Sequence, residues 1–229
     1  MNKKAVILSS GGIDSTTAMA IAKSEGYTIY SLSFRYGQRH SIEINSAINV
    51  AKDMCAEKHL ILNLDMGKIG GSALTEKIDV PKHNSIEELM CREIPITYVP
   101  ARNTIFLSYG LAWAEVIGAE VIFIGVTAVD YSGYPDCRPE YINAYEKMAN
   151  LATRTGVTGK TRLKIRTPLI KLSKGEIIQQ GINLGVDYSL TISCYDPDSK
   201  GRSCGRCDSC LHRKKGFQEA GIPDPTIYI

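Results

Sequence analysis

The sequence lacks any apolar run of about 18 residues, the length at which a membrane-spanning helix becomes a candidate. Near the N-terminus, Lys3 and Lys4 precede only a short apolar stretch and then a polar loop, so no secretory signal peptide is expected. The chain also lacks a strong excess of charge of one sign, because its formal net charge is +3. We therefore expect a cytoplasmic protein with no membrane partner and no direct nucleic-acid partner.

Internal repeats and low-complexity segments are also absent, and 229 residues suffice for one main core with a small appendage. Short apolar segments alternate with amphipathic ones. The predicted strands are residues 4–8, 27–34, 60–64, 121–125 and 163–165; the predicted helices are residues 14–25, 41–58, 104–117, 139–154 and 173–184; residues 66–100 are expected to form a long loop or insertion. This alternation predicts an α/β fold with a doubly wound parallel sheet.

The first strand is followed by the polar stretch SSGGIDSTT, which leads into the first helix. In a doubly wound sheet this turn lies where ligands bind, and the helix N-terminus attracts anions. Gly11 and Gly12 let the backbone approach an anion closely, the hydroxyl groups add donors, and Asp14 could hold Mg²⁺. The alternative is a glycine turn with Asp14 as a helix cap and no ligand. The density of hydroxyl groups favours a phosphate loop.

No lysine follows the glycines, so the loop is not a Walker A motif. Its form S-G-G-x-D-S, at residues 10–15, instead resembles the PP-loop of the adenine-nucleotide alpha-hydrolase superfamily. The resemblance implies cleavage of ATP, with Mg²⁺, between the α- and β-phosphates. The residues expected to bind ATP are Leu8, Ser9, Ser10, Gly11, Gly12, Ile13, Asp14, Ser15, Thr16, Thr17 and Ala18.

A second segment, P-L-x-x-L-x-K-x-E at residues 168–176, is similar to one in related ammonia-dependent ligases where a lysine reaches the phosphates. We therefore predict Asp14 and Lys174 as catalytic residues. The alternative for Lys174 is a solvated residue in the first turn of a helix, where a cation is slightly unfavourable against the helix dipole.

Four of the seven cysteines form the pattern C-x9-C-x2-C-x2-C near the C-terminus: Cys194, Cys204, Cys207 and Cys210. Four thiolates suit a tetrahedral structural Zn²⁺ with no open position. An iron–sulfur cluster is the competing interpretation, although the tail of the bacterial ferredoxin motif is absent. We predict a small zinc-binding subdomain at residues 187–229, following an ATP-binding catalytic domain at residues 1–186.

Three further polar segments accompany the loop and the cysteines: FRYGQRH at residues 34–40, VPARN at 99–103 and DYSGYPDCRPEY at 130–141. Together these motifs resemble the QueC family over essentially the whole chain. The resemblance implies an ATP-dependent carbon–nitrogen ligase of queuosine biosynthesis. Its members convert 7-carboxy-7-deazaguanine and ammonia into the nitrile 7-cyano-7-deazaguanine through adenylated intermediates.

Residues of these segments are candidates for binding that small-molecule substrate. The predicted set is Arg35, Tyr36, Gln38, Arg39, Arg102, Asn103, Asp130, Tyr131, Ser132, Tyr134, Asp136 and Arg138. Arginines bind carboxylate or phosphate through paired contacts, and Tyr131 or Tyr134 could stack on the flat deazapurine. For each arginine, a structural ion pair is the alternative. Cys137 is not required as a nucleophile, because ATP already activates the substrate.

Two other functions stay open at the level of the sequence. A PP-loop enzyme that inserts sulfur into tRNA would share the adenylation step but need a catalytic cysteine pair or an iron–sulfur cluster. A zinc-ribbon binding module would bind nucleic acid in a salt-dependent manner and would not turn over ATP. We also expect a homodimer, although the sequence does not fix the oligomeric state.

Overall fold

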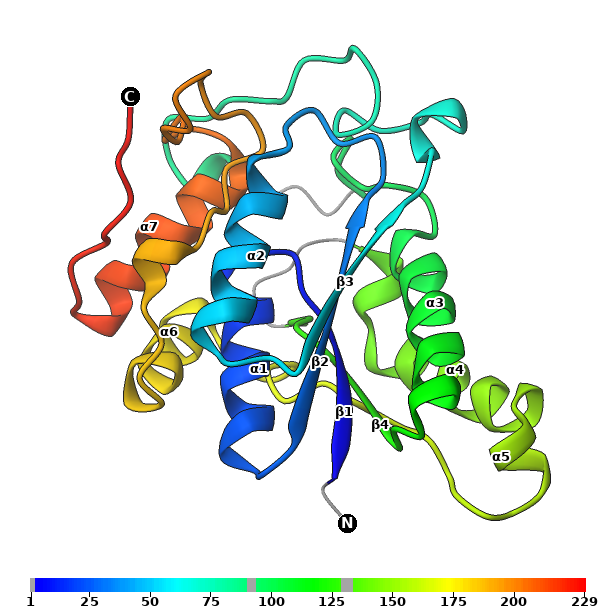
Figure 1. The fold of residues 1–229 in the computed structure, drawn as a ribbon. Coiled ribbons are helices and arrows are strands. Elements are labelled where there is room, and N and C mark those ends of the chain that lie inside the picture. The colour runs from blue at the N-terminus through cyan, green and yellow to red at the C-terminus, as the bar shows by residue number, and fades with distance from the viewer. Residues whose placement is uncertain (1–2, 90–93, 129–133) are drawn as a thin grey trace.

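The computed structural model describes residues 3–89, 94–128 and 134–229. Five parallel strands form one sheet in the order β3-β2-β1-β4-β5 (Figure 1). The strands are β1 (Lys4–Leu8), β2 (Thr28–Arg35), β3 (Lys58–Asn63), β4 (Val121–Ile124) and β5 (Lys164–Arg166). The order reverses direction between β1 and β4, and this switch point is where ligands bind in sheets of this kind.

Helices cover both faces of the sheet. The helices are α1 (Ile13–Ser24), α2 (Ile42–Asp53), α3 (Arg102–Ile117), α4 (Pro139–Ala152), α5 (Arg154–Val157), α6 (Lys174–Asn183) and α7 (Asp208–Ala220). Figure 1 shows α1, α2, α6 and α7 on one side and α3, α4 and α5 on the other. Alternate residues of β1 serve the two layers, since Ile7 packs in the core with α1 and Val6 in the core with α3.

This arrangement confirms the predicted doubly wound parallel sheet, and the loop that resembles a PP-loop lies at its first turn. The predicted capping box is also present, because the Ser173 side chain accepts from the Glu176 amide and the Glu176 side chain accepts from the Ser173 amide. Between residues 66 and 100, the described part forms only two short 3-10 turns, η1 (Met66–Lys68) and η2 (Glu87–Leu89). No helix in the described ranges is long and apolar enough to cross a bilayer.

The structure differs from the helix predictions at the end of α2, at the break between α4 and α5, and at α7. The helix predicted over residues 41–58 ends at Asp53, because the chain turns at Cys55, whose φ of 56° is incompatible with a continuing right-handed helix. Helix α7 was not predicted, since its cysteines and basic residues mask the apolar periodicity. It packs against α6 (Figure 1), and its Arg213 side chain is buried in an ion pair with Asp224.

Candidate functional site

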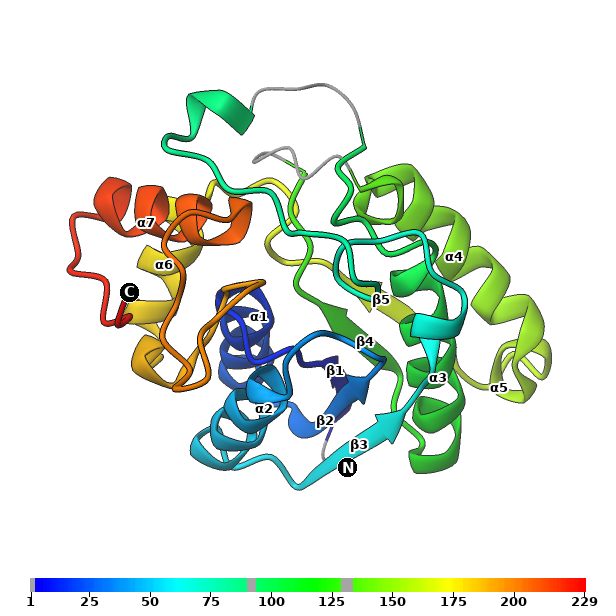
Figure 2. The same cartoon turned by 90° about the horizontal axis from the view of Figure 1, so that it is seen from above.

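A cavity of about 700 Å³ opens at the carboxyl ends of the strands. Its walls include the loop after β1, the segment after β2, the first turns of α2 and α3, the end of β4, the first half of α7, Lys174, Ile192, Ser193 and Tyr195. Figure 2, seen from above, shows how the loops over this end of the sheet surround the N-terminus of α1. The cavity therefore occupies the switch point between β1 and β4.

The loop after β1 is held from outside as well as from within. Gly11 has a φ of +78°, and a Cβ built on it would lie 2.6 Å from the backbone nitrogen of Ala47, so α2 packs directly on the loop. The Ile192 amide donates to the Gly11 carbonyl oxygen at 3.0 Å. Within the loop, the Ser15 hydroxyl accepts from the Ser10 amide at 3.2 Å. The loop is thus fixed in shape beside the N-terminus of α1, an arrangement suited to phosphate.

The residues predicted to bind ATP are not all exposed to the cavity. Those that line it are Leu8, Ser9, Ser10, Ile13, Asp14 and Ser15. Gly11 and Gly12 shape the turn between them. The hydroxyl groups of Thr16 and Thr17 donate within the helix, to the carbonyl oxygens of Gly12 and Ile13, and Ala18 is buried. These three residues support the loop from inside α1.

Asp14 and Lys174 form an ion pair at the edge of the cavity. The Lys174 Nζ atom lies 2.6 Å from Asp14 Oδ1 and 2.8 Å from Oδ2, although the two residues are 160 positions apart in the sequence. Both side chains are largely buried, since the side chain of Lys174 is 13% exposed and that of Asp14 is 29% exposed. Lys174 begins α6 and packs against Gly216 of α7, where a Cβ would collide with its side chain. The two predicted catalytic residues are therefore brought together.

Another part of the cavity wall is aromatic and carries a cation. The guanidinium carbon of Arg102 lies 5.9 Å from the ring centres of both Tyr36 and Tyr134. Phe34 and Phe106 stack face to face with their ring centres 4.0 Å apart, and both line the cavity. This wall offers flat apolar faces to a planar ligand and a positive charge to an anionic one.

The four C-terminal cysteines gather at one point. Their Sγ atoms all lie within 4.8 Å of one another. The amides of Asp196 and Cys204 donate to Cys194 Sγ at 3.3 and 3.2 Å, and the Cys207 amide donates to Cys204 Sγ at 3.3 Å. Such donors stabilise thiolates, so the cluster could hold a metal ion such as zinc.

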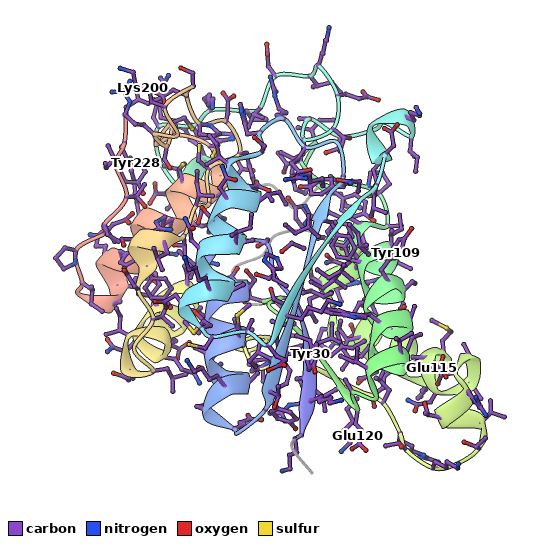
Figure 3. All side chains as sticks on the ribbon, viewed as in Figure 1. Tyr30, Tyr109, Glu115, Glu120, Lys200 and Tyr228 are labelled. Carbon is purple, nitrogen blue, oxygen red and sulfur yellow. The ribbon has the colours of Figure 1, made fainter. Side chains whose placement is uncertain are left out.

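Figure 3 labels Tyr228 at the same end of the molecule as Lys200, which lies between Cys194 and Cys204 in the sequence. The tail folds over the cysteine loop, because Ser203 pairs with Tyr228 and the Lys214 ammonium lies 4.3 Å from the Tyr228 ring centre. Lys214 also donates to the Gly205 carbonyl oxygen at 2.9 Å, so this cation is held within the cysteine loop.

A family described as "Queuosine biosynthesis protein QueC" matches residues 4–221. The chain belongs to the QueC family. A protein of Desulfatibacillum aliphaticivorans named 7-cyano-7-deazaguanine synthase is 64% identical over 227 residues, covering 99% of this chain and 97% of that protein. One of Syntrophobacter fumaroxidans with the same name is 63% identical over 227 residues, with the same coverage. These full-length matches place the chain among proteins of queuosine biosynthesis.

A solved structure of NMN synthetase from Francisella tularensis is also similar, with a TM-score of 0.49 and 16% identity over 97% of this chain and 74% of that one. This similarity is too distant to bear on activity.

For this QueC family member, the structure brings five predicted substrate residues to the cavity: Tyr36, Gln38, Arg102, Asn103 and Tyr134. It does not bring Arg35, Arg39, Asp136 or Arg138 to the cavity wall. Arg39 donates to the Ile78 carbonyl oxygen at 2.7 Å and Arg138 to that of Pro135 at 3.2 Å. Asp130, Tyr131 and Ser132 lie outside the described residues.

Asp136 has a structural position instead. Its carboxylate accepts a hydrogen bond from the backbone amide of Asn103 at 2.9 Å. Asn103 lies in the first turn of α3, where backbone amides need acceptors. Burial raises the pKa of Asp136, while the Asn103 amide and the Arg102 charge counter that effect. Asp136 thereby fixes the start of the helix that carries Arg102.

Sequence reasoning missed Glu43, which lines the cavity from the first turn of α2. Burial raises the pKa of Glu43 to about 7, and the charge of Arg102 opposes the shift. No motif marks this residue, because an acidic side chain in the first turn of a helix is ordinary. Only the packing of α2 on the PP-loop brings it to the site.

Proposed function

We propose that the chain is an ATP-dependent ligase that converts 7-carboxy-7-deazaguanine and ammonia into 7-cyano-7-deazaguanine. The observation that carries the proposal is the match, over nearly the full length of both chains, to relatives that bear the name of this synthase. The cavity supports it, since a loop suited to phosphate faces a wall suited to a flat anionic ligand.

The reaction requires activation because a carboxylate is a poor electrophile. In the first round, a carboxylate oxygen attacks the α-phosphorus of ATP and pyrophosphate leaves. Ammonia then attacks the acyl carbon, loses a proton and displaces AMP to give the amide. In the second round, the amide oxygen attacks another α-phosphorus with loss of one N–H proton. Elimination of AMP with the remaining N–H proton leaves the nitrile.

The residues of the chain bind and orient the groups in both rounds. Backbone amides of the PP-loop and the N-terminus of α1 hold the departing pyrophosphate, and Lys174 neutralises its charge. Asp14 would hold Mg²⁺, which neutralises the phosphates when it is bound, and its carboxylate faces the cavity as this requires. Arg102 pairs with the substrate carboxylate, and Tyr36 and Tyr134 pack against its ring.

The four cysteines hold a structural zinc ion, and residues 187–229 form the zinc-binding subdomain beside a catalytic domain at residues 1–186. The four Sγ atoms and their amide donors fit a closed tetrahedral site with no free position for a substrate. Zinc without iron in the purified protein would agree with this assignment, and an iron–sulfur chromophore would contradict it.

We further propose that the enzyme works in the cytoplasm as a homodimer on small molecules, without direct binding of nucleic acid. Analytical ultracentrifugation tests the dimer. Titration of labelled tRNA at low salt tests the second point, and binding that weakens steeply with salt would contradict it.

Mass spectrometry of the products tests the reaction. With ATP, ammonium and 7-carboxy-7-deazaguanine, we expect the nitrile together with AMP and pyrophosphate. The amide should also be converted to the nitrile without ammonia, because it is the intermediate between the two rounds. ADP as the main nucleotide product would exclude adenylation, and inert amide would exclude the two-round route. Transfer of sulfur to tRNA would favour the sulfur-insertion alternative.

A further inference from the structure

The backbone of Glu43 packs closely against the PP-loop. It lies in the first turn of α2, and a Cβ built on Gly11 would be only 2.7 Å from the Glu43 carbonyl oxygen. The position of Glu43 is therefore fixed by close packing between the loop and α2. Its side chain extends from this fixed point into the wall of the cavity.

The Glu43 carboxylate has a charged neighbour but accepts no hydrogen bond from the part of the chain that the structure describes. The charge of Arg102 lowers the pKa of Glu43 against the effect of burial, and the charge of Glu43 in turn raises the pKa of Tyr36. Within residues 3–89, 94–128 and 134–229, no hydrogen bond or ion pair engages its oxygens. Desolvation raises its pKa to about 7, as is typical of a carboxylate whose donors are missing.

A ligand that completes this site must supply N–H donors and a flat surface. A carboxylate has two acceptor oxygens side by side and no donor, so it matches two adjacent N–H groups. The aromatic wall formed by Phe34, Tyr36 and Phe106 suits a planar ring. A guanine-type edge, with its ring N–H and its 2-amino group, has both properties.

We propose that Glu43 is the specificity-determining residue of the substrate site and accepts hydrogen bonds from the ring N–H and the 2-amino group of the deazaguanine. The inference rests on the proposed function and adds to it the residue that recognises the deazaguanine base. The Glu43 carboxylate selects against the adenine of ATP, because adenine presents an acceptor nitrogen beside its amino group, and two acceptors repel.

The test compares binding of two ligands by isothermal titration calorimetry at pH 8. One ligand is 7-carboxy-7-deazaguanine, and the other is its analogue without the 2-amino group. The wild-type protein should bind the analogue about 10- to 100-fold more weakly, since a hydrogen bond to a charged group is lost. Glu43→Gln should bind the full ligand about 10- to 100-fold more weakly, discriminate between the two by less than about threefold, and keep the KM for ATP.

Glu57→Gln is the matched control. It removes the same charge from an exposed position just before β3, at the amino-terminal edge of the sheet, and should leave both affinities unchanged. Equal affinity of the wild-type protein for the two ligands would overturn the assignment of Glu43 but leave the proposed function standing. So would a Glu43→Gln variant that keeps its discrimination but loses kcat equally with both ligands, which is the signature of a general base. Failure of the wild-type protein to bind 7-carboxy-7-deazaguanine would overturn the proposed function as well.

Discussion

Asp14 and Lys174 form a preassembled pair at the mouth of the PP-loop. Both oxygens of the carboxylate accept from the same ammonium group. On the proposed function, entry of ATP with its metal would separate the pair, because Asp14 would then face the cation and Lys174 the phosphates. The ion pair would thus hold the two opposite charges in place before ATP binds.

Asp14→Asn tests the functional half of this pair. Asn fits the first turn of a helix, so the fold should persist, but the melting temperature should fall because the largely buried Lys174 ammonium loses its ionic partner. Turnover should fall by about 100- to 1000-fold, because a neutral amide binds Mg²⁺ poorly and no longer opposes Lys174. Steady-state kinetics over a range of Mg²⁺ concentrations measures the effect, with exposed Asp53→Asn as the control. Unchanged kinetics and Mg²⁺ dependence would leave Asp14 with a structural role only.

The raised pKa of Glu43 predicts how the stability of the folded protein depends on pH. Its pKa is raised to about 7 in the folded protein, from 4.5 when unperturbed. A carboxyl group with a raised pKa favours the folded state below pH 4.5, and this contribution is lost as the pH rises through 7. The groups that face it do not titrate in this range, since Arg102 stays charged and burial raises the pKa of Tyr36 to about 12.

The Glu43→Gln variant should therefore melt at a higher temperature than the wild-type protein at pH 8 and at nearly the same temperature at pH 4.5. Differential scanning calorimetry across this range measures the difference, and Glu57→Gln should show no comparable trend. A stability difference independent of pH would contradict a desolvated Glu43 carboxylate. A gain in melting temperature on replacement is typical of a ligand-binding residue whose burial lowers the stability of the folded protein.

At the scale of elements, the contact between the PP-loop and α2 depends on one glycine. A side chain at Gly11 would meet the Ala47 nitrogen at 2.6 Å and the Glu43 carbonyl oxygen at 2.7 Å, and both are backbone atoms that cannot swing away. The positive φ of 78° adds a conformational cost of about 1–2 kcal/mol for any other residue. The loop and the helix must therefore separate if Gly11 is replaced.

Gly11→Ala should abolish ATP-dependent turnover and lower the melting temperature by more than its matched control. Gly26→Ala is that control, because Gly26 has a similar φ of 81° but open space around the missing Cβ. It should cost about 1–2 kcal/mol, or several degrees in melting temperature, with an unchanged KM for ATP. Equal behaviour of the two variants would mean that conformational strain, and not packing on α2, explains the requirement for glycine.

At the scale of the whole molecule, the C-terminal segment returns to the first loop of the chain. The Ile192 amide bonds to Gly11, and the Tyr188 hydroxyl lies 2.7 Å from the Thr17 hydroxyl. Cys194 follows two residues after Ile192. The cysteine cluster therefore lies at the end of a segment that supports the PP-loop.

Cys207→Ala should consequently affect both stability and ATP binding. Structural zinc contributes on the order of 10 kcal/mol to the folding of small zinc domains, so its loss should unfold the C-terminal segment or make the protein insoluble. In any soluble fraction, we expect little bound zinc, faster hydrogen exchange around residues 188–195 and weaker ATP binding. Cys55→Ala removes an exposed thiol outside the cluster and should change none of these. Full zinc content with unchanged stability would exclude Cys207 as a ligand.

Much of this protein was predictable from near neighbours in the chain. The alternation of strands and helices, the glycine turn before α1, the capping box of α6 and the cysteine spacing each depend on residues a few positions apart. Local backbone preferences and short ligand spacings are physical effects of that range. The same locality explains two of the failures, since the turn at Cys55 and the start of α7 lack a sequence signal of their own.

The tertiary structure alone decided which distant residues meet. The pairing of Asp14 with Lys174, the support of Gly11 by Ile192 and the approach of Glu43 to Arg102 join segments that no local pattern relates. They meet because the order of parallel strands brings all carboxyl ends to one edge, and because α2 and α6 pack on the same layer as α1. Burial at that edge raises the pKa of Glu43, and this loss of hydration is not marked by any local sequence pattern.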